Sequence, residues 1–160
     1  PLKVIREQLD AMDSGKVAAV ITEPAPAVSA ESFRPAAPVR LTDTEVAERA
    51  KTTDADVAEL MKAGIIAPDA SGLFSAVDVQ IATTAAALKE FGLDARHLKT
   101  LRTAASRQAD LVTRVTDPIA HSGKDSARQE ADELAQQISA LIVSLHASLV
   151  KSELRNQLSS

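Results

Sequence analysis

The sequence predicts a mainly α-helical protein, in which a small helical unit precedes a long antiparallel pair of helices. Aromatic residues make up 2% of the chain, and Trp and Tyr are absent, so the common strand formers are scarce. Ala, Leu, Glu, Lys, Arg and Gln are abundant, and all of them favour helices. Apolar residues also recur three and four positions apart along the second half of the chain. We therefore expect helices that pack through small aliphatic side chains.

The first forty residues are expected to hold one helix and a linker. Apolar residues with the spacing of one helix face stand at Leu2, Ile5, Leu9 and Met12. Because this stripe is already running at the first residues, we expect residues 1–12 to be the last helix of a unit that lies upstream. Residues 13–40 lose the periodicity and carry repeated prolines, which predicts a Pro/Ala-rich, semi-rigid linker. A short strand at 17–21 is an alternative.

Two short helices are expected after the linker. Thr42 and Glu45 have the spacing of a capping box, in which a hydroxyl and a carboxylate each accept a hydrogen bond from the other residue's backbone amide. Thr53 is expected to cap a second helix, which Gly64 ends in a left-handed conformation. The pair has the size of a helix-turn-helix.

A tight hairpin or small β-wing is expected between Ile65 and Phe74, where Pro, Asp, Ser and Gly interrupt apolar residues. Ser75 and Asp78 are expected to cap a third helix, which Gly92 ends. We expect the core of this unit, residues 41–101, to contain Val46, Val57, Leu60, Ile65, Phe74 and Leu88.

Two long helices of matching length are expected to form an antiparallel αα-hairpin over residues 102–158. Asp94 caps the first, the break falls at 121–124, and Asp125 begins the second. The apolar face of the last helix is wider than one partner needs, so we expect a second copy of the chain to cover it. The expected dimer interface comprises Leu134, Ile138, Leu141, Ile142, Leu145 and Leu149. The alternative is burial of the whole stripe within one chain.

Several short sequence motifs along the chain resemble those of a known family. Lys62-Ala-Gly-Ile-Ile-Ala-Pro68 ends the second helix, a Ser-Gly wing follows, and Phe74-Ser-Ala-Val-Asp78 opens the next helix. This order resembles the winged-helix DNA-binding domain of MerR-family transcription regulators. Phe91-Gly-Leu-Asp-Ala-Arg-His-Leu98 resembles the turn into the fourth helix of that domain, and Pro1–Leu9 resembles the fourth helix itself. Residues 1–12 are thus expected to end an upstream DNA-binding domain, and residues 41–101 to be a degenerate second copy.

The linker and the degenerate copy together most resemble the branch of the family that regulates cell-division genes in high-GC Gram-positive bacteria. The resemblance implies a head domain that binds promoter DNA as a dimer and distorts it for RNA polymerase. We expect this chain to be the dimerisation and effector region of such a regulator. Its partners would be a second copy, promoter DNA through a head absent from this chain, and RNA polymerase or another protein on the degenerate winged helix.

The second copy departs from the family pattern where DNA would be bound. Its expected recognition helix carries Asp54, Asp56 and Glu59, which repel phosphates. Ser71-Gly72 lacks the paired arginines that follow this dipeptide in the family, and acidic residues outnumber basic ones by four over residues 41–101. We expect no DNA contact from this chain or, failing that, contact through Arg49, Lys51 and Lys62. The alternatives are a second winged helix that itself binds DNA, and a small-molecule sensor.

The sequence contains no set of residues typical of a catalytic site, so we expect the protein not to be an enzyme, with no catalytic residue and no cofactor. The absence of cysteine excludes thiolate chemistry, and the three histidines lack the spacing of a metal-binding pair, so no metal site is expected. Neither a Gly-rich phosphate loop nor a nucleophile elbow occurs. No stretch of the sequence is expected to provide the roughly 20 apolar residues of a membrane span, so a cytoplasmic protein without membrane contact is expected.

Overall fold

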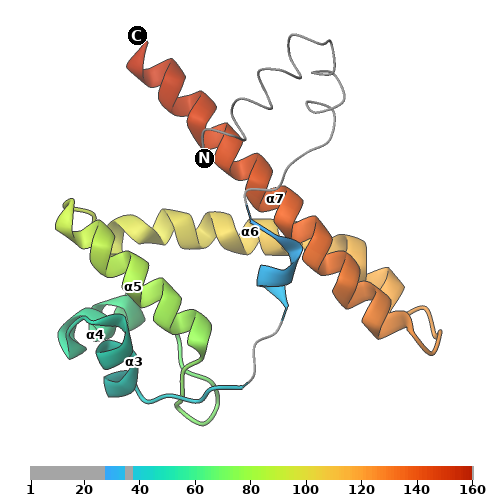
Figure 1. Cartoon of the computed structure of the whole chain (residues 1–160), viewed down its shortest axis with the longest axis horizontal. Helices are drawn as coiled ribbons and strands as arrows, with labels where there is room; N and C mark the ends of the chain where they lie inside the picture. Colours follow the sequence, from blue (N-terminus) through green and yellow to red (C-terminus); the bar gives the residue numbers. More distant parts are fainter. Residues whose placement is uncertain (1–27, 35–37, 160) are drawn as a thin grey trace, which may run out of the picture.

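The computed structural model describes residues 28–34 and 38–159 and shows them as an assembly of helices (Figure 1). A short 3-10 helix, η1 (Ala30–Phe33), precedes five α-helices. These are α3 (Asp43–Ala50), α4 (Asp54–Lys62), α5 (Ala76–Glu90), α6 (Ala95–Ala120) and α7 (Ala127–Leu158). The prediction of a mainly α-helical protein is confirmed. The predicted helix over residues 1–12 and most of the predicted linker lie outside the described residues.

Side-chain caps fix where the helices begin. The Thr42 hydroxyl accepts a hydrogen bond from the Glu45 amide at 3.2 Å, and the Glu45 carboxylate accepts one from the Thr42 amide at 3.2 Å. Ser75 and Asp78 form the same capping box at the start of α5. These bonds satisfy amides that the first turn of a helix leaves without partners. Local sequence therefore sets the boundaries from which the core is assembled.

Helices α3, α4 and α5 enclose the main core together with the first turn of α6. Leu41, Ile66, Val46 and Val57 are its largest fully buried side chains. The residues expected in this core lie as follows: Val46, Val57, Leu60, Ile65 and Phe74 are buried, and the half-buried Leu88 packs against them. The core is therefore made mainly of aliphatic side chains, with Phe74 as its buried aromatic residue.

The β-wing expected between Ile65 and Phe74 does not form a pair of strands. Within the described residues, β pairing is limited to one antiparallel bridge between Leu41 and Phe74, with hydrogen bonds of 2.9 and 2.7 Å. The intervening segment is a turn around Asp69, whose carboxylate accepts hydrogen bonds from the amides of Ser71 and Leu73. A side chain that satisfies nearby amides competes with strand pairing. The predicted wing is therefore replaced by a turn held by Asp69.

Helices α6 and α7 pack on each other but do not run side by side along their whole lengths. α6 has 26 residues and α7 has 32, so the predicted equal lengths are wrong. In Figure 1 the two helices cross, and the C-terminal end of α7 lies on the opposite side of α6 from α3 and α4. Small buried residues of α7, Ala127, Ala131 and Ala140, allow the backbones to approach closely. The predicted full-length antiparallel hairpin is thus not the arrangement observed.

Two features connect segments that were predicted to belong to separate domains. α6 is one continuous helix, although the predicted boundary fell between residues 101 and 102. η1, from the region predicted to be a linker, packs against α7 (Figure 1). Residues 30–33 of the predicted semi-rigid linker are therefore docked on the long helix.

Candidate functional site

The most exposed apolar region of the described chain lies on the C-terminal half of α7. Six large side chains between residue 141 and the end of α7 are between 44% and 83% exposed: Leu141, Leu145, Leu149, Val150, Leu154 and Leu158. They form two rows on opposite sides of the helix, Leu141, Leu145 and Leu149 on one side and Val150, Leu154 and Leu158 on the other. We call these six residues together the α7 apolar surface. Every described residue from Ser148 to Ser159 is exposed, so nothing in the described chain covers this end of the helix. An apolar surface of this kind is typical of an interaction site.

The six residues predicted to form a dimer interface fall into two groups. Leu134, Ile138 and Ile142 are half-buried, on the part of α7 that accompanies α6. Leu141, Leu145 and Leu149 are exposed and belong to the α7 apolar surface. The structure thus brings three of the six to an available surface. Val150, Leu154 and Leu158 were missed by sequence reasoning, although their four-residue spacing is visible in the chain.

Gln108 and His146 form a polar contact between α6 and α7. The Gln108 Nε2 atom lies 2.8 Å from His146 Nδ1 in a partly buried position. C-terminal to His146, the side chains of α7 become exposed, and Leu101 and Ala105 of α6 are exposed as well. The pair therefore lies close to where the two helices separate.

A groove of about 370 Å³ lies between α5 and the part of α6 that precedes Gln108. Its walls are mostly apolar, with Ile81 and Leu88 from α5 and Leu98 and Leu101 from α6. Arg102 is the one charged residue among the described residues that line it. We call this feature the α5–α6 groove.

The three residues considered for DNA contact are all exposed and lie at the C-terminal ends of α3 and α4. Arg49 is in the last turn of α3, Lys51 caps that helix with a left-handed φ of 56°, and Lys62 ends α4. Arg49 and Lys51 lie at the end of one helix and Lys62 at the end of another, and the exposed residues of α4 include the acidic Asp54 and Glu59. Their separation leaves no continuous basic strip for a phosphate backbone.

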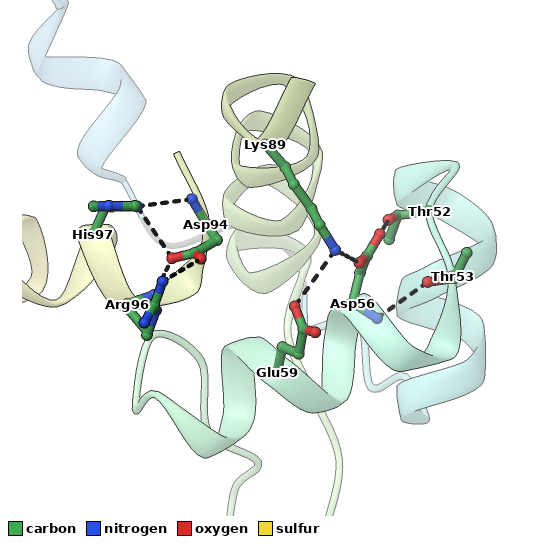
Figure 2. A network of polar contacts seen from close by, with 8 residues as sticks. All are labelled: Thr52, Thr53, Asp56, Glu59, Lys89, Asp94, Arg96 and His97. Carbon is green, nitrogen blue, oxygen red and sulfur yellow. Dashed lines mark hydrogen bonds and ion pairs between the residues drawn. The ribbon is translucent and has the colours of Figure 1, made fainter. Parts of the chain in front are cut away.

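An ion-pair network ties α4 to α5 (Figure 2). Lys89 Nζ lies 2.5 Å from an Asp56 carboxylate oxygen and 3.5 Å from a Glu59 oxygen. Thr52 also donates a hydrogen bond to Asp56. The hydrogen bond from Lys89, helped by that from Thr52, lowers the pKa of Asp56, and the same contact raises the pKa of Lys89. This network uses the α4 carboxylates to hold the fold together.

A second polar cluster caps α6. The Asp94 carboxylate accepts hydrogen bonds from the Arg96 guanidinium at 3.3 Å and from the Arg96 amide at 3.0 Å (Figure 2). These bonds lower the pKa of Asp94, with the side-chain bond from Arg96 as the largest cause. His97 Nδ1 lies 3.1 Å from the Asp94 amide and completes the cap. The cluster marks the start of α6, and the charge of Asp94 is balanced by the Arg96 guanidinium.

Two further properties bear on the kind of site that α7 provides. Among the described residues, no group of three His, Asp or Glu side chains is placed to hold a metal ion. α7 is long and apolar enough, by length and composition alone, to cross a membrane. The expectation that no stretch approaches a membrane span therefore does not hold for this helix, although one such helix is weak evidence for a span. Its packing on α6 and η1 instead places it within the helical assembly.

Comparison with known sequences establishes the family. The model of the Rv1828-like C-terminal domain matches residues 39–158. The chain belongs to the Rv1828-like C-terminal domain family. Two relatives are each 36% identical to the chain over 171 residues, an alignment that covers 99% of this chain and 69% of each relative. They are the HTH-type transcriptional regulators Rv1828 of Mycobacterium tuberculosis and Mb1859 of Mycobacterium bovis.

The family boundary agrees closely with the start of the described core. The Rv1828-like match begins at residue 39, next to the bridge residue Leu41, and it includes both the α5–α6 groove and the α7 apolar surface. Both relatives carry names of transcription regulators, which places this chain with the C-terminal domains of such regulators.

Proposed function

We propose that the chain is the dimerisation and effector region of a MerR-like transcription regulator, and that a separate N-terminal head binds promoter DNA. The regulator names of both relatives and the match to a C-terminal domain support this role. Each relative extends beyond the aligned region, which leaves room for such a head. The proposal includes a cytoplasmic protein of the cell-division branch that does no catalysis and whose winged-helix-like unit is free to dock RNA polymerase or another protein.

The observation that carries the dimerisation proposal is the α7 apolar surface. Burial of a leucine-sized side chain contributes about 1.5 to 3 kcal/mol. Association costs on the order of 4 to 15 kcal/mol in lost freedom. One contact can bury one row of three from each protomer, and six such side chains in total contribute a free energy of about the same size as that cost. The exposed side chains, with no cover in the described chain, therefore favour a second copy as the partner.

Solution mass tests the proposal directly. The mass of the chain is measured by light scattering or sedimentation over a hundredfold range of concentration, for the wild type and for Leu149→Glu and Leu154→Glu. We expect a wild-type dimer and monomeric variants with unchanged helix content, because both side chains are exposed. Gln137→Glu is the matched control, since it adds a carboxylate to an exposed α7 position outside the α7 apolar surface. A wild-type monomer throughout the range would overturn the proposal.

The same samples distinguish dimerisation from direct DNA binding by this chain. We expect no salt-sensitive binding of duplex DNA near micromolar concentration in gel-shift titrations. Two observations support that expectation. Lys89 is paired with Asp56, and the remaining cations Arg49, Lys51 and Lys62 lie at the ends of two different helices. Binding that is lost on replacing Lys62 by Ala would instead favour the second winged helix as a DNA-binding unit.

A further inference from the structure

Two apolar features face solvent on the same protomer and match each other. The α5–α6 groove is open, and the last three turns of α7 are exposed, with no described residue covering them. The two features lie on different parts of the fold, with the C-terminal end of α7 beyond α6 from α3 and α4 (Figure 1). A helix of this length cannot bend back on its own protomer without breaking its backbone hydrogen bonds. A second copy of the chain, however, could place the end of its α7 in this groove and receive the end of the first copy's α7 in its own groove.

The dimensions of the two features agree. The groove is lined along α5 from Gln80 to Leu88 and along α6 from Leu98 to Ala105. At about 1.5 Å per residue, these edges are roughly 10 to 12 Å long. The α7 segment from Leu149 to Leu158 is exposed throughout and is roughly 14 Å long on the same scale. The groove can therefore accept about two turns of that helix.

The charges of the two features are complementary. Arg102 is the one charged side chain among the described residues that line the groove. Glu153 lies one turn after Leu149 and beside Val150 and Leu154, and is thus within the apolar side of the projecting helix. Neither Arg102 nor Glu153 forms an ion pair with another described residue. Each is therefore available to the other across an interface.

We propose that the dimer forms by reciprocal exchange, in which the C-terminal end of α7 from each protomer lies in the α5–α6 groove of the other, with Glu153 paired to Arg102. This inference rests on the proposed dimerisation and names its two contacting surfaces. The exchange uses the same two surfaces twice, so it closes on a two-fold axis and fills both grooves. A direct α7–α7 contact would leave the groove empty.

Charge reversal tests the pairing. Arg102→Glu and Glu153→Arg each place like charges opposite one another twice per dimer, so we expect the dissociation constant to rise roughly tenfold or more for each variant. Both side chains are exposed, so the fold should persist, and circular dichroism checks this. Arg107→Glu is the control, because it makes the same charge change on α6 outside the groove.

Mixing the two reversed variants gives the decisive result. In a mixed dimer, one interface pairs Glu at 102 with Arg at 153 and the other keeps the native pair, so we expect association to return to within about threefold of wild type. If the wild type is dimeric but the reversals change nothing, or mixing restores nothing, the groove is not the site and the exchange is overturned while dimerisation stands. A monomeric wild type would overturn both.

Discussion

Gln108 of α6 and His146 of α7 lie 2.8 Å apart, and this pair stands near the point where the two helices part. The half-buried residues Leu134, Ile138 and Ile142 precede it along α7, and the exposed end of the helix follows it. A partly buried polar pair has one preferred geometry, so it holds the register of the crossing more specifically than apolar side chains do. The direction in which α7 projects, and hence the availability of its apolar surface, depends on this contact.

Replacing Gln108 by Ala should loosen the crossing of α6 and α7. The loss of one partly buried hydrogen bond is expected to lower the free energy of unfolding by about 0.5 to 1.5 kcal/mol, because His146 then lacks its partner. Urea denaturation followed by circular dichroism measures this change. Gln129→Ala is the matched control, since Gln129 donates a hydrogen bond to the exposed Glu133 within its own helix. Equal effects of the two substitutions would mean that the interhelical pair has no special role.

The Asp56–Lys89 pair predicts how stability depends on pH. The pKa of Asp56 is below its usual 3.8, so the pair stabilises the fold above that pH and loses this contribution as pH falls through the lowered pKa. The pKa of Lys89 is above its usual 10.5, so the contribution is present below that pH and disappears as pH rises through the raised pKa. The stabilising window therefore covers neutral pH.

Replacing Lys89 by Met should remove this window. We expect Tm to fall by about 1 to 3 °C at neutral pH, with wild type and variant converging as pH falls through the lowered pKa of Asp56 and as it rises through the raised pKa of Lys89. Thermal scans over that range measure the difference, which also cancels the acid dependence due to Asp69 and Asp94. A difference that stays constant with pH would show that Lys89 acts through its aliphatic chain and not through its charge.

Features set by neighbouring residues could be predicted from the sequence. The caps at Thr42, Ser75 and Asp94 begin helices because each acts on an amide within three positions, so the signal is local. The turn at 69–73 is harder to predict, because its Pro-Asp-x-Ser-Gly pattern fits both a hairpin and a turn held by the Asp69 carboxylate. Local geometry decided between them.

Contacts between distant residues could not be predicted in the same way. Lys89 is 33 positions from Asp56, and Gln108 is 38 positions from His146, and no periodic pattern links either pair. The stripe of α7 predicted an interface, but only the crossing angle with α6 determines that Leu145 is exposed whereas Ile138 is half-buried. That angle depends on packing of small residues such as Ala131 and Ala140, which sequence periodicity does not encode.

Two phenylalanines provide a last test of where the core lies. Phe74 is 3% exposed and its backbone bridges to Leu41, whereas Phe91 is 85% exposed in the turn between α5 and α6. Phe74→Ala should lower the free energy of unfolding by about 3 to 5 kcal/mol, because it removes buried apolar contacts and leaves a cavity. Phe91→Ala should change it by less than about 0.5 kcal/mol, as an exposed substitution does. Chemical denaturation of both variants measures the contrast. A large loss of unfolding free energy from Phe91→Ala would mean that a second copy of the chain covers this turn in solution.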